Sequence, residues 1–203
     1  MLVRKRTFLL VGAVGVVSLV AWLVLALNCP SAGIAITPRA RRLHVLKNRT
    51  AFPQEGDFDS RVTLEALLQR GDDRNRWSVD RAARLQGVVI DVAYAGTEAT
   101  NCFNPCRRDI HILIATHKGA SKSEHVVLEV TPNLRDWAAG QGIDWSEETL
   151  QKQLVGHWCE FEGWLYFDVA HDEESENVAP GNPENWRATG WEIHPITKIR
   201  VLD

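Results

Sequence analysis

Five segments of the chain have the residue pattern of β-strands, and their order along the sequence is the strongest constraint on its fold. Apolar and polar side chains alternate in them, so each strand would direct one face to a core. The predicted strands are residues 86–95, 108–116, 126–130, 157–168 and 191–202. A helix is predicted between the third and fourth strands, over residues 144–154, where Asp144 and Glu147 have the spacing of a capping box.

This order of three strands, a helix and two strands predicts an OB-like domain, a small five-stranded Greek-key barrel. A parallel sheet built from βαβ units would need more helices, and a β-sandwich would need more strands. The long connections 96–107 and 169–190 would then join strands 1 to 2 and 4 to 5. In OB domains these two loops flank the usual ligand-binding face.

The N-terminus carries an uncharged apolar run over residues 7–27. At about 1.5 Å per helical residue it reaches about 30 Å, which is the thickness of the hydrocarbon core of a bilayer. The cations at residues 4–6 favour a cytoplasmic N-terminus, although the arginines at 39, 41 and 42 favour the reverse. We expect a single-pass anchor with residues 30–203 in the periplasm or another extracytoplasmic space. A signal peptide cleaved near residues 31–33 is the alternative.

The expected organisation therefore has four parts. Residues 1–28 form the cytoplasmic tail and transmembrane anchor, and residues 29–56 form a tether punctuated by prolines. Residues 57–85 form a helical segment that packs on the barrel, and residues 86–203 form the barrel itself. The basic stretch 39–47 would either contact anionic headgroups or remain solvated. The predicted fold class is mainly β, with a transmembrane helix, a tether and an OB-like barrel that has a helix between strands 3 and 4.

Charge and motif content exclude several functions. The chain has 23 Lys+Arg against 26 Asp+Glu and a net charge of −3, which is not the basic footprint of a nucleic-acid-binding protein. The loop at residues 172–176 is acidic and would repel a phosphate backbone. The motifs for phosphate, dinucleotide and zinc-protease chemistry and the G-x-S-x-G elbow are missing. We therefore expect no cofactor and no nucleic-acid partner.

Four stretches of the chain resemble a poorly characterised group of small bacterial extracytoplasmic proteins. They are RRDIHILI, VVLEVTP, VGHWCEFEGWLYFD and NWRATGWEIHPITKI. The group shares the pattern RDxHI…EVTP…GWLxFD…RATxWEIHP, and the resemblance covers about residues 60–203. It implies an OB-like domain and brings no activity with it.

Two pairs of polar residues are candidates for a site. Asp109 and His111 are two apart on one predicted strand, and Glu192 and His194 are two apart on the last, so each pair shares a face. Two carboxylates and two imidazoles are able to bind a divalent metal or to act as acid and base. The alternative is a structural hydrogen-bonded network, which the separation of strands 2 and 5 in an OB-like barrel favours.

The cysteines predict a disulfide. In an oxidising compartment, Cys102 and Cys106 would pair and close the first long loop. Zinc binding with His111 downstream is the alternative, although the C-x₃-C spacing is not that of zinc sites. Cys159 is expected to be a buried thiol.

Aromatic residues mark a candidate interface on the fourth predicted strand. If Cys159 and its alternate neighbours face the core, then Trp158, Trp164 and Tyr166 point outward. Trp and Tyr on an outer face are typical anchors of protein interfaces. The alternative is that residues 57–85 fold over them.

These observations favour a non-enzymatic, membrane-anchored extracytoplasmic domain that binds another membrane or periplasmic protein, as an accessory subunit of a membrane complex. A metal-assisted hydrolase using Asp109, His111, Glu192 and His194 is the first alternative. The second is an OB domain that binds a small ligand or glycan between loops 96–107 and 169–190.

Overall fold

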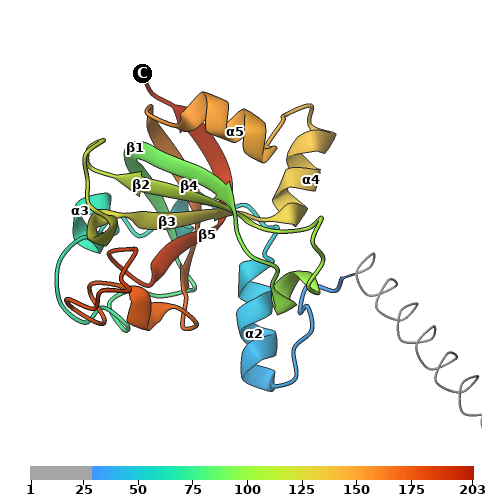
Figure 1. Ribbon diagram of the computed structural model, residues 1–203. Helices are drawn as coiled ribbons and strands as arrows, with labels where there is room; N and C mark the ends of the chain where they lie inside the picture. The colour runs from blue at the N-terminus through green and yellow to red at the C-terminus, as the bar shows by residue number, and fades with distance from the viewer. Residues whose placement is uncertain (1–28) are drawn as a thin grey trace, which may run out of the picture.

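The computed structural model describes residues 29–203, in which five strands close into a barrel (Figure 1). The strands are β1 (Ala82–Tyr94), β2 (Ile110–Ala115), β3 (Val126–Val130), β4 (Trp158–Phe167) and β5 (Trp191–Val201). Their order around the barrel is β1-β2-β3-β5-β4, and β4 returns to pair with β1. The pairing of β3 with β5 is parallel and the others are antiparallel. The predicted mainly-β, five-stranded barrel is confirmed and is consistent with an OB-like fold.

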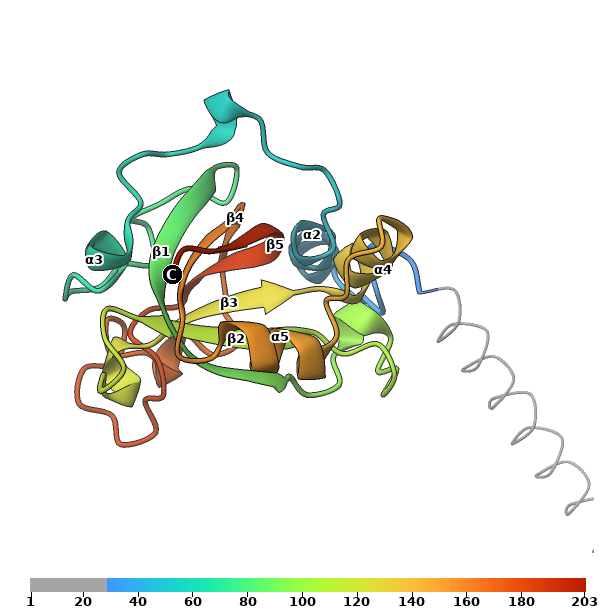
Figure 2. The ribbon, with the colours of Figure 1, turned by 90° about the horizontal axis from the view of Figure 1, so that it is seen from above.

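In the described part of the chain, four helices lie outside the barrel: α2 (Pro38–Lys47), α3 (Leu64–Leu67), α4 (Pro132–Gly140) and α5 (Glu147–Leu154). Single 3₁₀ turns occur at Glu55–Asp57, Ala99–Asn101, Lys122–Glu124 and Asp172–Glu174. Helices α2 and α4 lie on one side of the barrel and α3 lies on the opposite side (Figures 1 and 2). Helix α5 follows β3 and precedes β4, as predicted, and packs against β1.

The ends of α5 and the presence of α4 differ from the prediction. Ser146, not Asp144, is the N-cap of α5, and its hydroxyl accepts a hydrogen bond from the Thr149 amide at 3.3 Å. Asp144 instead accepts from the Ser146 amide at 2.8 Å, which fixes the turn before the helix. The sequence does not predict helix α4, because Pro132, Leu134 and Ala138 are its only buried residues, too few for a clear helical period.

The core lies inside the barrel and extends under the helices. The alternating isoleucines of β2 and the alternate residues of β4, including Phe161, face inward. Leu64 and Leu67 of α3 and Leu154 of α5 belong to the same cluster. Gly163 allows β4 to approach β5 closely, because a Cβ at this position would lie 2.2 Å from the carbonyl oxygen of Pro195.

Residues 57–85 pack on the barrel, but the helix expected there is a single turn. Strand β1 begins at Ala82, four residues earlier than predicted. No helix within residues 29–203 combines the length and apolar character needed to cross a bilayer. The predicted span 7–27 lies outside the described residues.

The segment 29–56 differs from the expected tether, because it contains α2 and is attached to the barrel. Thr37 caps α2 by accepting from the Ala40 amide at 3.1 Å, and Pro38 occupies the first helical turn. Proline is favoured there because the first amides of a helix have no intrahelical acceptor. The prolines were interpreted as breaks in structure, whereas this one begins a helix.

The disulfide also differs from the prediction. Cys102 pairs with Cys29, with a Cα–Cα distance of 5.8 Å, and Cys106 is an exposed free thiol. Cys102 and Phe103 have left-handed backbone conformations, with φ of 54° and 52°, and Cys102 is buried. The pairing with Cys106 was inferred from short separation in sequence, which carried no information about Cys29. Cys159 is a buried free thiol.

Candidate functional site

A polar network occupies the outer face of the barrel where β2, β3 and β5 meet. Since Ile112 and Ile193 face the core, their neighbours His111 and His194 project to the outside. Strand β3 pairs with both β2 and β5, and its Glu129 lies opposite His111. Glu129 therefore joins two strands that do not themselves pair.

The contacts within the network are short. One Glu129 oxygen, Oε1, lies 3.2 Å from His111 Nε2, and the other, Oε2, lies 3.2 Å from His194 Nδ1. His194 Nδ1 also lies 3.4 Å from Glu192 Oε2. Asp109 precedes β2, and its Oδ2 accepts a hydrogen bond from Asn101 Nδ2 at 3.0 Å. Except for His111, whose side chain is partly exposed, these residues are buried.

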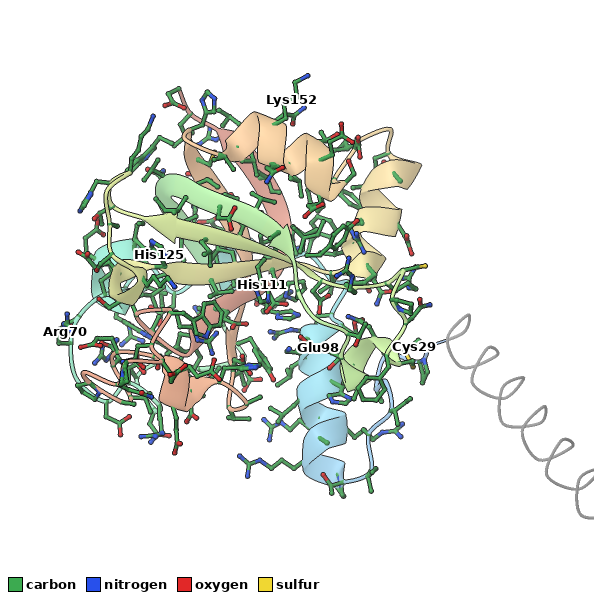
Figure 3. The ribbon with its side chains drawn as sticks, in the orientation of Figure 1. Cys29, Arg70, Glu98, His111, His125 and Lys152 are labelled. Carbon is green, nitrogen blue, oxygen red and sulfur yellow. A yellow bond between two sulfur atoms is a disulfide. The ribbon has the colours of Figure 1, made fainter. Side chains whose placement is uncertain are left out.

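Two basic side chains complete the network. Lys47, the last residue of α2, directs its Nζ to Glu98 Oε2 at 2.8 Å. In Figure 3 the labelled Glu98 and His111 lie close to the upper end of α2. Arg187 is fully buried and donates to Glu192 at 2.5 Å and to Asp168 at 3.1 Å.

The electrostatics of the cluster are strongly perturbed. Burial, with Glu129 nearby, raises the pKa of Asp109 to about 7. Burial alone would lower the pKa of His194, but the facing Glu129 and its hydrogen bonds raise it to about 10. Burial would raise the pKa of Glu129, but His194, His111 and Lys47 hold it well below its usual value. Burial opposes the charge of Lys47, yet Glu129 and Glu98 raise its pKa well above the usual value.

All four polar residues singled out in the sequence belong to this network, although β2 and β5 are not paired. The residue that connects them, Glu129, was not singled out. It is nevertheless part of the EVTP sequence. A carboxylate in the otherwise apolar strand VVLEV indicates a buried, paired charge, because acidic side chains are rarely buried without a partner. Lys47 was also missed, because it lies in the segment interpreted as a tether.

Three members of the network are arranged as metal ligands. Asp109, Glu129 and His194 each offer one ligand atom, and these atoms lie within 4.8 Å of one another. The predicted set of Asp109, His111, Glu192 and His194 is therefore replaced by one that includes Glu129. Glu192 is instead paired with Arg187.

The aromatic residues predicted as interface anchors have different environments. Tyr166 is only 3% exposed, and Lys47 Nζ lies 5.6 Å from its ring centroid, so the prediction that it anchors a partner is wrong. Trp164 donates its Nε1–H to the Ala51 carbonyl at 2.7 Å, and Arg49 lies over its ring. Trp158 is 36% exposed. Residues 47–51 therefore contribute to the cover of Tyr166 and Trp164.

A second aromatic cluster is exposed and lines a groove. Phe52 and Trp137 pack with ring centroids 4.6 Å apart, and Trp137 lies 6.3 Å from Trp145. Phe52, Trp137 and Ile143 are 36%, 40% and 45% exposed. Together with Pro53 and Ile199, they line a groove of about 260 Å³, which we call the aromatic groove. The sequence did not reveal it because residues 52 and 137 are far apart in the chain.

No protein-family model and no curated protein matches the chain. The fold and the site geometry therefore carry the functional argument.

Proposed function

We propose that the protein is a non-enzymatic, membrane-anchored extracytoplasmic domain that docks onto another membrane or periplasmic protein. It would act as an accessory subunit of a membrane complex. The observation that carries this proposal is the aromatic groove at Phe52, Trp137 and Ile143.

The groove has the composition of a binding surface. Large aromatic side chains dominate the energetics of protein interfaces, and exposed contiguous apolar patches are uncommon without a partner. Polar residues border it, including Glu162 and Lys198, whose charged groups lie 3.0 Å apart. An apolar centre with a charged rim is the usual arrangement of a docking site.

The disulfide supports an extracytoplasmic location and a position close to the membrane. Disulfides such as Cys29–Cys102 persist mainly in oxidising compartments. Cys29 is the second residue after the predicted span 7–27, so the bond would hold the β1–β2 connection at the bilayer surface. A docking partner within the same membrane would then be within reach.

The polar network does not favour the hydrolase alternative. Asp109, Glu192 and His194 are buried, and Glu192 is neutralised by Arg187. A catalytic group must be within hydrogen-bond reach of a substrate, which burial of this kind prevents. On the face of β2 and β3, where an OB domain would bind a ligand or glycan, Glu129 is likewise buried.

The test is site-specific crosslinking in the native membrane. A photoreactive residue at position 137 should give one discrete crosslinked partner, and the same residue at position 158 should not. The variant Trp137→Ala should lose co-purification of that partner in mild detergent while retaining its melting temperature. Absence of a crosslinked partner for the position-137 variant, together with purification of the wild-type chain as a monomer, would refute the proposal.

A further inference from the structure

We propose that Asp109, Glu129 and His194 bind a divalent transition-metal cation, for which Zn²⁺ is the best fit. This site is independent of the docking surface. The cation would join β3, β5 and the residue that precedes β2.

The spacing of the three side chains suits one ion. Their ligand atoms lie within 4.8 Å of one another. Ligands at about 2.1 Å from a tetrahedral zinc ion are separated by about 3.4 Å, so small side-chain rotations would complete the geometry. The mixture of one imidazole nitrogen and carboxylate oxygens favours Zn²⁺ over Ca²⁺ and Mg²⁺, which prefer oxygen ligands alone.

Asp109 and His194 each have a buried polar atom with no hydrogen-bond partner among the described residues, namely Asp109 Oδ1 and His194 Nε2. Glu129 Oε2, the neighbouring carboxylate oxygen, lies 3.2 Å from His194 Nδ1. All three residues are no more than 2% exposed. Buried polar atoms are nearly always paired, and two unpaired atoms in one cluster need an explanation. A single cation would satisfy both of them.

Neighbouring residues orient the three side chains. Asn101 donates to Asp109 Oδ2, and His111 lies 3.2 Å from Glu129 Oε1. His194 Nδ1 lies 3.2 Å from Glu129 Oε2 and 3.4 Å from Glu192 Oε2. Outer contacts of this kind orient metal ligands, and they leave Asp109 Oδ1 and His194 Nε2 free to coordinate.

The charges also leave a place for a cation. Of the five carboxylates in the cluster, Glu98 is paired with Lys47, and both Asp168 and Glu192 are paired with Arg187. Neither of the remaining two, Asp109 and Glu129, forms an ion pair with a lysine or arginine of the described chain, although Lys47 is near enough to lower the pKa of Glu129. A divalent ion would displace the proton of His194, and with these two carboxylates and the resulting neutral imidazole it forms a unit with no net charge.

The test uses the full-length protein in mild detergent, stripped with a chelator and titrated with Zn²⁺. Calorimetry should give one site per chain, and saturating Zn²⁺ should raise the melting temperature by roughly 5–10 °C. The variants Asp109→Asn and His194→Gln should each weaken Zn²⁺ binding by about 100-fold or more. His157→Gln, which changes an exposed histidine, should bind as the wild type does.

Two results would overturn the assignment. One is the absence of stoichiometric Zn²⁺ binding by the wild-type chain, or binding of Ca²⁺ or Mg²⁺ alone. The other is retention of wild-type Zn²⁺ affinity in both variants, which would place the ion elsewhere. Asp109→Asn preserves the shape of the side chain, so its Zn²⁺ affinity alone tests the assignment if His194→Gln does not fold.

Discussion

Removal of the Cys29–Cys102 disulfide should strongly destabilise the protein. The bond joins residues separated by 73 positions. The loss of chain entropy that such a crosslink imposes on the unfolded state corresponds to about 4.4 kcal/mol at 25 °C. A bond between Cys102 and Cys106 would close a much smaller loop and contribute about 1.9 kcal/mol on the same relation. The magnitude therefore distinguishes the two pairings.

The assay is thermal unfolding in mild detergent, followed by tryptophan fluorescence, since the chain contains eight tryptophans. For a domain of this size, a loss of about 4.4 kcal/mol corresponds to a decrease in melting temperature of roughly 9–18 °C. Cys29→Ser should show this decrease, and reductant should reproduce it in the wild-type protein.

Cys106→Ser is the matched control, because it removes an exposed free thiol. Its melting temperature should equal that of the wild type, and peptide mapping of the oxidised protein should recover Cys29 linked to Cys102. If Cys106→Ser is destabilised while Cys29→Ser is not, the pairing described here is wrong.

Three further outcomes follow from the polar network and the anchor. Lys47→Met should cost about 3–5 kcal/mol in urea unfolding because it leaves buried carboxylates without their cation, whereas Arg39→Met on the same helix should cost little. The hydrogen bond to Asp168 raises the pKa of His171 in spite of burial. The stability that the His171–Asp168 pair contributes to the fold is therefore complete below about pH 6.5 and is lost as pH rises through the folded-state pKa of His171. NMR titration of His171 should give a midpoint above about 6.5. The variant Asp168→Asn should lower that midpoint. A reporter fused after Asp203 should be active only when exported, and cytoplasmic activity would contradict the proposed topology.

The barrel could be predicted because each strand carries its own signal. The alternation of Ile110, Ile112 and Ile114 identifies β2 without reference to the rest of the chain, and the strand order then limits the topology. Helix α2 could not be found in this way. It has little apolar periodicity. Its attachment to the barrel depends on the ion pair of Lys47 with Glu98 and on the disulfide of Cys29, which precedes the helix, and both are contacts with residues far away in sequence.

The candidate site was predicted only in part, for the same reason. Asp109, His111, Glu192 and His194 are conspicuous as polar pairs within strands, but their meeting point depends on how β3 pairs on both sides. Glu129 lies among valines and a leucine, in a strand that is buried along its whole length. Its contacts with His111 of β2 and His194 of β5 depend on the pairing of the three strands, which the sequence of β3 alone does not reveal.

Closure of the barrel restricts the way in which any partner can be recognised. Proteins with an open sheet often bind by adding a strand of the partner to an unpaired edge, which uses main-chain hydrogen bonds and is tolerant of sequence. Here each of the five described strands has a neighbour on both sides. Recognition must then depend on side chains and loops, so it should be selective for the partner's surface, and the same closure protects the chain from edge-to-edge aggregation.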